Sequence, residues 1–391
     1  MSKVLFANHL RLGSASSYRQ AGFAKYLGLR GHNCGLIGRA DEPSYHASQA
    51  GAKLQGRDAA TEWDYYSQIQ NWKEPFVTKF IGNSRLFSRV SKQYSVVHVN
   101  RAHPFTASVI SSARSHNWKL VVDMEDWDGF GGYSTYAHKY NAAGGLLTLY
   151  EQFFPRTADA VIVVSSLLQR LMIRAGVSKR KIYHIPNGYD PDLFHNNISG
   201  LKIREEYNLG RSPVVMYAST YWSFEKELHE TALAAFRKIT KYNSAVKFLL
   251  VGSGNIEIKT IATKYGLGEN AVATGFVPRY KVPQLMAAAD VAMHVISNHP
   301  FHVASSPMII PEYMAVGKPV VAPRIGELNT MLDNRAGLLV DRPDADLLAE
   351  GVIKLLGDET LRLDLGIRAA SRASGNYSYR ILAQKLEQIY R

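Results

Sequence analysis

One acidic residue and the segment around it carry the strongest chemical signal in the chain. Glu312 lies between Pro307 and Gly317, where the residue pattern predicts one short amphipathic helix that the glycine ends. A helix that begins after a polar loop presents unpaired backbone N–H groups, and these suit a phosphate. A carboxylate within the helix accepts hydrogen bonds from sugar hydroxyls. The alternative is a surface helix whose glutamate is simply solvated.

A second acidic group follows a predicted strand at Leu120–Val122. The segment Asp123–Gly129 holds four carboxylates within six residues. The carboxyl ends of strands are where open α/β sheets bind ligands. Neighbouring carboxylates repel one another unless a cation lies close or some of their pKa values rise. Glu125 and Asp126 are therefore candidates for orienting a substrate, and a solvated acidic loop is the alternative.

A loop of small residues follows the first predicted strand, Val4–Ala7. The loop runs over Gly13–Ser17 and leads into a predicted helix over residues 18–30. Strand, small-residue loop and helix form the anion-binding arrangement of Rossmann-like domains, although the full Gly-x-Gly-x-x-Gly pattern is absent. Arg19, one turn into the helix, would add positive charge.

Short apolar strands alternate with helix-period segments along the whole chain. This alternation predicts an α/β protein with parallel sheets. At 391 residues the chain suits two domains. Further strands are predicted at these segments: 96–99, 158–165, 214–218, 248–251, 289–294, 320–322 and 337–341.

The composition is that of a globular protein, with 46% hydrophobic and 20% charged residues. No apolar run is long enough for a membrane span, and the first residues lack the apolar core of a signal peptide. Cys34 is the only cysteine, which fits a reducing compartment. We therefore expect a cytoplasmic protein.

The chain carries a net charge of +13. Residues 1–195 hold most of this excess, with 23 Lys and Arg against 14 Asp and Glu. Such a balance favours anionic partners, although it also serves solubility alone. Residues 72–92 interleave five basic residues with phenylalanines at near-helical spacing, which suits a helix lying on the inner face of the cell membrane. The alternative is a helix that packs its phenylalanines on its own domain.

Two motifs resemble a known family. Glu312-Tyr-Met-Ala-x-Gly-Lys-Pro-Val-Val, and Pro186-Asn-Gly-x-Asp followed by Phe194, are similar to segments of the retaining, nucleotide-sugar-dependent glycosyltransferases of family 4. The resemblance implies the GT-B fold, in which two Rossmann-like domains with parallel sheets face a cleft. We expect an acceptor domain over 1–195, a donor domain over 196–376, and a terminal helix over 377–391 that packs back on the first domain.

The resemblance also assigns roles to residues. Glu312 would hold the donor ribose, Lys226 would bind the donor diphosphate, and Glu125 and Asp126 would orient hydroxyl groups. The other donor-binding candidates form this set: Gly13, Ser14, Asn187, Ser219, Gly252, Phe276, Val277, Ser305, Ser306, Pro307 and Met308. Backbone groups of Phe276 and Val277 would contact the nucleotide base.

The sequence departs from the family pattern at several of these positions. The first glutamate of the family's Glu-x7-Glu pair is Ala304 here, and Glu125 stands where a histidine is usual. The arginine that accompanies Lys226 on the diphosphate has no clear counterpart. Arg279, Arg324 and an arginine of the first domain are candidates to replace it. The candidates to replace the missing glutamate are His299, His302, Ser305 and Ser306.

The interpretation that fits these patterns best is a retaining glycosyltransferase. It would transfer a sugar from a UDP or GDP sugar to a sugar, lipid-linked or other hydroxyl acceptor in polysaccharide or glycolipid assembly. We expect no bound cofactor, no essential metal and no nucleic acid partner. Two alternatives stay open: a catalytically weakened protein that binds nucleotide sugar or glycan, and a nucleotide-sugar epimerase.

Overall fold

The computed structural model describes most of the chain. The described residues are 1–11, 15–40, 64–69, 93–103, 106–107, 109–110, 113, 118–137, 141–219, 225–252, 255–333 and 335–391. Gly13, Ser14 and the basic segment 72–92 lie outside the described residues.

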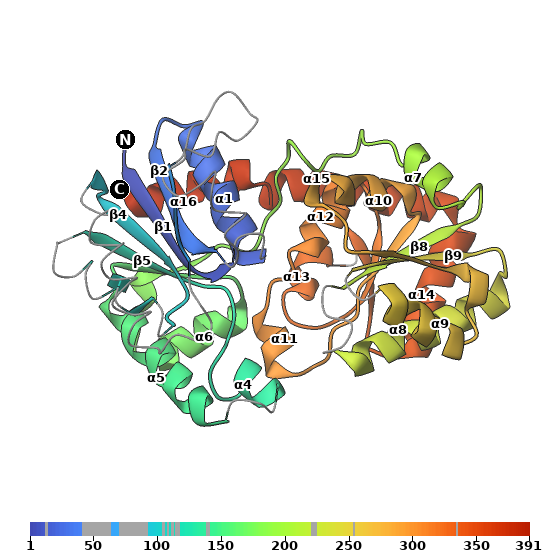
Figure 1. Ribbon diagram of the computed structural model, residues 1–391, viewed down its shortest axis with the longest axis horizontal. Coiled ribbons are helices and arrows are strands. Elements are labelled where there is room, and N and C mark those ends of the chain that lie inside the picture. The colour runs from blue at the N-terminus through green and yellow to red at the C-terminus, as the bar shows by residue number, and fades with distance from the viewer. Residues whose placement is uncertain are drawn as a thin grey trace. The chain divides into compact units, whose positions relative to one another are not determined.

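The chain forms two compact units, each built on one sheet (Figure 1). The first unit comprises Met1–Gly188, Ala304–Ser306 and Tyr379–Arg391. The second comprises Tyr189–Val303 and Pro307–Ser378.

The sheet of the first unit has seven strands in the order β3-β2-β1-β4-β5-β6-β7, and every pair is parallel. Parallel strands joined by helices bury both faces of a sheet, so their sequences are apolar at consecutive positions. In β1, Val4 and Phe6 belong to one buried cluster, and Leu5 and Ala7 belong to another. The strands are β1 Lys3–Arg11, β2 Asn33–Ala40, β3 Asp64–Ile69, β4 Val96–Asn100, β5 Lys119–Met124, β6 Ala160–Val163 and β7 Ile182–His184.

Helices cover the sheet of the first unit. They are α1 Ala15–Gly28, α4 Tyr133–Tyr136, α5 Asn141–Thr157, α6 Ser166–Arg174 and the terminal α16 Tyr379–Tyr390. Ser165 caps α6, because its hydroxyl accepts a hydrogen bond from the Leu168 amide at 3.2 Å. Helix α16 packs against α1 and contributes Leu382 and Leu386 to the same buried cluster as Phe6.

The sheet of the second unit has six parallel strands in the order β10-β9-β8-β11-β12-β13. The strands are β8 Val214–Ala218, β9 Lys247–Val251, β10 Ala271–Gly275, β11 Val291–Met293, β12 Val320–Pro323 and β13 Gly337–Val340. The helices are α7 Leu201–Glu206, α8 Lys226–Tyr242, α9 Asn255–Lys264, α10 Val282–Ala288, α11 Pro300–Ala304, α12 Ile309–Ala315, α13 Leu328–Leu332, α14 Ala345–Gly357 and α15 Glu359–Asn376. The predicted α/β fold with two parallel sheets is therefore confirmed.

In each sheet, the direction in which successive strands are added reverses at one point, where the sheet changes winding. The chain runs outward from β1 through β2 to β3 and then returns to β4 on the other side of β1, and in the second sheet it runs from β8 through β9 to β10 and returns to β11 in the same way. In open parallel sheets the loops after the strands part at such a point and leave room for a ligand. The residues after β1 and β4, and those after β8 and β11, are therefore where binding groups are expected.

The end of helix α12 follows the predicted geometry. Gly317 has a φ of +74°, which an L residue adopts at a cost, and its amide bonds to the Met314 carbonyl at 2.9 Å. The Lys318 amide closes the turn on the Tyr313 carbonyl at 2.9 Å. The glycine stop predicted from the sequence is confirmed, and it fixes the exit of the chain into β12.

A close approach between α1 and α16 yields the first prediction. A Cβ atom on Gly22 would lie 2.3 Å from the Tyr379 ring, so Gly22→Ala forces a buried aromatic side chain to move. We expect a loss of about 1–3 kcal/mol of stability, measured by urea unfolding.

The matched control for this prediction is Gly375→Ala, because nothing lies within 4 Å of the added atom on α15. Alanine at an open helical position stabilises by about 0.5–1 kcal/mol. Equal unfolding midpoints for Gly22→Ala and the unmodified protein would contradict the packing described.

Candidate functional site

A buried ion pair organises the carboxyl edge of the first sheet. Arg19 of α1 and Asp123 of β5 are both fully buried, and the Arg19 Nε atom lies 2.8 Å from Asp123 Oδ2. The second nitrogen of the fork, Nη2, lies 3.1 Å from Asp123 Oδ1. Burial alone would raise the pKa of Asp123, but Arg19 and His98 lower it to about 2. The carboxylate is therefore ionised and paired at neutral pH.

The same guanidinium also holds the end of the first unit's main chain. It donates to the carbonyls of Ile185 and Pro186 at 2.9 and 2.8 Å, and to Asn187 Oδ1 at 3.1 Å. Because Arg19 is buried and bound on all of these sides, it does not supply the loop charge that the sequence suggested.

Asn187 is in turn bound to the segment 304–306. Its amide donates to Ser306 Oγ at 3.1 Å, and its side-chain nitrogen donates to the Ser306 carbonyl at 2.7 Å. Ser306 is buried, and Ala304 packs into the core cluster that contains Leu5 and Ala7. Two predicted donor residues thus contact each other, and their polar atoms serve to position this segment.

Each carboxylate after β5 has a partner. The Asn100 side chain donates to Glu125, and the Arg19 Nε atom lies 3.7 Å from the same carboxylate. Arg101, whose φ is +58°, pairs with Asp126 and lies 3.1 Å from Asp128. The expected repulsion among the four carboxylates is therefore relieved by two arginines.

Burial, with a smaller effect of the Asp128 charge, raises the pKa values of two carboxyl groups in and beside this loop. Burial is the main cause that raises the pKa of Asp126; the charge of Arg101 opposes it, and the charge of Asp128 adds a smaller rise. Glu151 of α5 accepts the amides of Asp128 and Gly129 at 2.7 and 2.9 Å. Its own pKa is raised to about 8, by burial first and by Asp128 second. The sequence predicted that these crowded carboxylates would need nearby cations or raised pKa values. Both occur around this loop.

The second unit gathers polar groups after β8 and β11. His302 donates or accepts at both ring nitrogens: Nε2 lies 3.0 Å from Glu225 Oε1, and Nδ1 lies 2.8 Å from Ser297 Oγ. His294, which follows β11, is close enough to Glu225 and His302 for both to influence its titration. Burial lowers the pKa of His294 to about 4, so it is neutral at physiological pH. Ser297, His302 and Glu225 form a hydrogen-bonded chain at the point where the second sheet changes winding.

Glu312 is buried in α12 and bound by an arginine. Arg279 contacts both carboxylate oxygens, with its Nη1 atom 3.0 Å from Oε2. The guanidinium also lies over the Phe194 ring, 4.7 Å from its centre. Burial raises the pKa of Glu312, and Arg279 opposes that rise. The paired carboxylate retains lone pairs that can accept hydroxyl groups.

Lys226, the predicted diphosphate residue, begins α8. Its side chain is 77% exposed, and its ammonium lies 3.6 Å from Glu230 on the same helix. An exposed pair of this kind is worth about 0.3–0.5 kcal/mol, so a phosphate can compete for the lysine.

The other predicted donor residues lie at the carboxyl edge of the second sheet. Ser219 follows β8, and its amide bonds to the Val251 carbonyl at 3.0 Å. Gly252 follows β9 with a φ of +148° and bonds to the Gly275 carbonyl at 3.2 Å. Phe276 and Val277 follow β10, and Phe276 is largely exposed. The parallel topology therefore brings these four residues to one edge, while Pro307 and Met308 precede α12.

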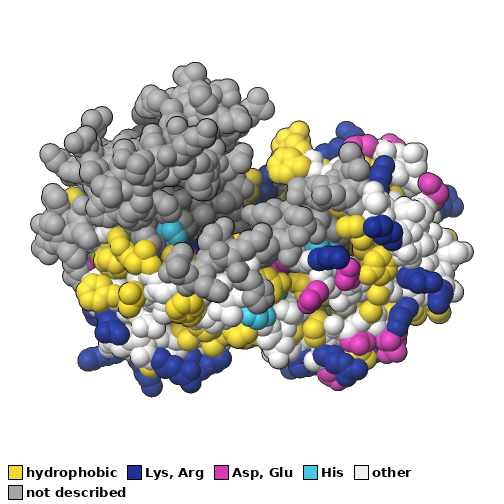
Figure 2. Space-filling view, turned by 60° about the horizontal axis from the view of Figure 1, so that its bottom comes forward, with side chains coloured by type: hydrophobic (Ala, Val, Ile, Leu, Met, Phe, Trp, Pro, Cys, Tyr) yellow, Lys and Arg dark blue, Asp and Glu magenta, His cyan; other side chains and the backbone are white. Residues whose placement is uncertain are grey.

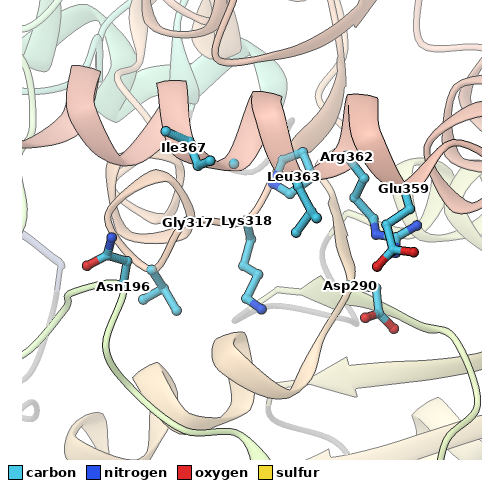
Figure 3. A pocket seen from close by; sticks show the side chains of 11 residues that line it. Asn196, Asp290, Gly317, Lys318, Glu359, Arg362, Leu363 and Ile367 are labelled. Atoms are coloured by element: carbon cyan, nitrogen blue, oxygen red, sulfur yellow. The ribbon is translucent and has the colours of Figure 1, made fainter.

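A cavity of about 350 Å³ lies at the opposite edge of the second sheet (Figure 3). Asp290 and Lys318 line it, and they precede β11 and β12 respectively. Asp290 is bound by Arg204 at 2.9 Å, and Lys318 donates to the Ala287 carbonyl at 2.9 Å. These two charged groups therefore link the starts of β11 and β12 to neighbouring helices. None of the predicted donor residues lines this cavity.

Sequence reasoning missed several of these residues. Glu225, Ser297, Asn100 and Glu151 stand in no motif, and their roles depend on partners between 5 and 77 residues away. Arg279 was a candidate for the diphosphate, whereas in the structure it binds Glu312.

Comparisons with known proteins agree with this architecture. Residues 21–193 match the family model described as Glycosyltransferase Family 4, and residues 212–358 match the one described as Glycosyl transferases group 1. The chain belongs to glycosyltransferase family 4, and it has the GT-B fold.

Relatives of this family 4 chain include a GDP-mannose-dependent alpha-(1-6)-phosphatidylinositol monomannoside mannosyltransferase from Mycolicibacterium smegmatis. It is 27% identical over 238 residues, which cover 59% of this chain. The capsular polysaccharide biosynthesis glycosyltransferase CapM from Staphylococcus aureus is 23% identical over 63% of this chain. The matches span 62% and 64% of the lengths of these two relatives.

Solved structures show the fold over the full length. Sucrose-phosphate synthase from Thermosynechococcus elongatus superposes with a TM-score of 0.77 at 18% identity, covering 100% of this chain and 98% of that one. Anabaena HepE, in complex with UDP and glucose, gives a TM-score of 0.75 at 18% identity and covers 99% of both chains. Among the described helices, none is long and apolar enough to cross a membrane.

The raised pKa of Glu151 yields the second prediction. The folded protein holds a proton on this carboxyl group that the unfolded chain releases above about pH 4.5. The contribution of Glu151 to the free energy of unfolding is therefore fully present below that pH, and it is lost as the pH rises toward about 8. In Glu151→Gln this decline should disappear from urea unfolding measured across the same range. Unfolding free energies that fall equally with pH in both proteins would contradict the assignment.

Proposed function

We propose that this family 4 protein is a retaining glycosyltransferase that moves a sugar from a nucleotide diphosphate donor to a hydroxyl acceptor. The single observation that supports this most is the cluster of polar side chains where the second sheet changes winding. Glu225 and Lys226 follow β8, and His294 and Ser297 follow β11, at the place where parallel sheets bind ligands. The mannosyltransferase and CapM relatives support the reaction class.

The donor is assigned to the second unit. Lys226 would neutralise the diphosphate, because its only described ion pair is a weak, exposed one. Glu312 would accept the ribose hydroxyls, and Arg279 would fix its orientation through two contacts on the carboxylate. Phe276 and Val277 would offer backbone groups to the base, with UDP or GDP as the nucleotide. The name of one relative specifies GDP-mannose, and HepE was solved with UDP.

Ala304 stands where the family's Glu-x7-Glu pair has its first glutamate, so another group must contact the donor sugar. We assign this role to the pair of His302 and Glu225, because both have buried or half-buried polar atoms beside the ends of β8 and β11. Ser297 completes the hydrogen-bonded chain and fixes the ring.

The acceptor is assigned to the first unit. Glu125 and Asp126 follow β5, are oriented by Asn100 and Arg101, and can accept hydrogen bonds from acceptor hydroxyls. The leaving diphosphate would itself take the acceptor proton, so no protein nucleophile is required. Gly13 and Ser14 remain proposed to face donor phosphates, and an acceptor that is lipid-linked or part of a polysaccharide fits the basic first half of the chain.

The reaction is tested by incubating the purified protein with UDP and GDP sugars, with and without hydroxyl acceptors. A transferase releases the nucleoside diphosphate in proportion to acceptor, and the anomeric configuration of the product tests retention. Binding with no acceptor-dependent release would support the weakened binding protein instead. Conversion of the nucleotide sugar without any acceptor would support the epimerase.

The role of Glu312 yields the third prediction. Glu312→Ala should lower kcat/KM by about 100-fold or more, because it removes a charged contact to the donor worth on the order of 2–4 kcal/mol. The control is Glu206→Ala, another carboxylate paired with a basic side chain, Lys281, at 2.6 Å. Loss of activity in both variants, or in neither, would refute the assignment to Glu312.

The role of Lys226 yields the fourth prediction. Lys226→Ala should lower kcat/KM by about 100-fold or more, with a weaker affinity for the free nucleoside diphosphate. Since the lysine is exposed, the variant should unfold at the same urea concentration as the unmodified protein. Lys238→Ala on the same helix, which removes a pair with Asp346, serves as the control. An unchanged diphosphate affinity in Lys226→Ala would exclude this role.

A further inference from the structure

Helix α5 of the first unit exposes a stripe of large apolar side chains. Leu146, Leu149 and Phe153 are 47%, 64% and 60% exposed. Their spacing of three and then four residues places them on one face of the helix. Single exposed apolar residues are ordinary on a soluble surface, but a row of three along one helix marks an interaction site.

A loop residue extends this stripe. Phe130 is 48% exposed, and its amide is held by Thr148 of α5, with a distance of 2.7 Å to the hydroxyl. Its ring rests over Gly144 and Gly145, where added Cβ atoms would lie 3.0 and 3.4 Å from it. The two glycines therefore make room for the ring on the helix. We call Phe130, Leu146, Leu149 and Phe153 the α5 patch.

The α5 patch carries no negative charge of its own. Glu151 is the single acidic residue in 141–157, and it is buried against the loop at Asp128 and Gly129. With a pKa of about 8 it is mainly protonated at neutral pH. The helix therefore presents an uncharged apolar face although it contains an acid.

Basic side chains lie next to this patch in the chain. Residues 141–184 contain six Lys and Arg against two Asp and Glu. The exposed basic residues are Arg156, Arg170, Arg174, Lys179 and Arg180. Arg156, at the end of α5, lies against the turn at Gly176, which follows α6. On the face that Figure 2 brings forward, apolar side chains of the first unit gather beside Lys and Arg side chains.

We propose that the α5 patch and its basic neighbours dock this protein on an anionic lipid bilayer. Apolar side chains enter the interface between headgroups and acyl chains, while the lysines and arginines bind lipid phosphates. Basic residues outnumber acidic ones among these neighbours, and Asp159 is the one exposed acid of 141–184. This excess favours a bilayer over a second protein, whose interface would need acids to match. Helix α5 also holds the loop that bears Asp128, so, resting on the proposed function, a lipid-linked acceptor would meet Glu125 and Asp126 from the docked surface.

The experiment is sedimentation of the full chain with phosphatidylcholine vesicles that contain or lack phosphatidylglycerol. The test variant is Leu146→Ser/Leu149→Ser/Phe153→Ser. The control is Leu363→Ser/Ile367→Ser, which removes two apolar side chains that are 57% and 71% exposed on α15 of the second unit. A charge variant, Arg170→Gln/Arg174→Gln, tests the basic neighbours.

The unmodified protein and the control should bind the vesicles that contain phosphatidylglycerol and only weakly bind the others. The patch variant should lose about tenfold or more in lipid affinity, and the charge variant should lose affinity for the anionic vesicles alone. Urea unfolding of each variant verifies that it is folded.

Three results would overturn the proposal. They are no binding of the unmodified protein to anionic vesicles, equal binding by the patch variant, and a dimer in solution that only the patch variant breaks. Retained binding by the patch variant would mean that another part of the chain makes the contact, such as the basic sequence segment 72–92. Nucleotide release with a soluble acceptor, measured without vesicles, tests the proposed function separately.

Discussion

The buried pair of Arg19 and Asp123 is the interaction on which the first unit's ligand edge depends. Both side chains are fully buried, and a buried charge without its partner is costly, so each requires the other. The remaining donors of Arg19 hold the carbonyls of 185 and 186 and the side chain of Asn187. One guanidinium thus joins α1, β5 and the Pro-Asn-Gly segment, and through Asn187 it fixes the position of Ser306. The motif that reveals the family is therefore organised by a residue outside it.

Charge compensation extends from this pair along the loop after β5. Arg101 forms ion pairs with Asp126 and Asp128. The Asn100 side chain donates a hydrogen bond to Glu125, and Glu151 accepts hydrogen bonds from two loop amides. The carboxylates are consequently held in defined directions by partners on β4, the loop after it, and α5. In the second unit, Arg279 does the same for Glu312. A fixed carboxylate loses little freedom when a hydroxyl binds, and fixed donors and acceptors of this kind are what transfer chemistry requires.

Much of the fold followed from the sequence, because strands buried on both faces are apolar at consecutive positions. The strand predicted at Val214–Ala218 has those limits in the structure, whereas the one predicted at Val4–Ala7 extends over Lys3–Arg11. The site was less predictable, since its partners are remote: Arg19 and Asp123 are 104 positions apart, and Glu225 and His302 are 77 apart. Local patterns placed the acids of 123–128 at a strand end, but they carried no information on which cations would meet them.

The measurement that tests the central claim most directly is a thermal-shift screen of the full chain against UDP, GDP, ADP and dTDP. A donor site at the carboxyl edge of the second sheet predicts a selective rise in Tm with one nucleoside diphosphate, because a ligand that binds only the folded state stabilises it. That rise should be absent in Lys226→Ala. No shift with any of the four nucleotides would contradict the donor site proposed around Lys226 and Glu312.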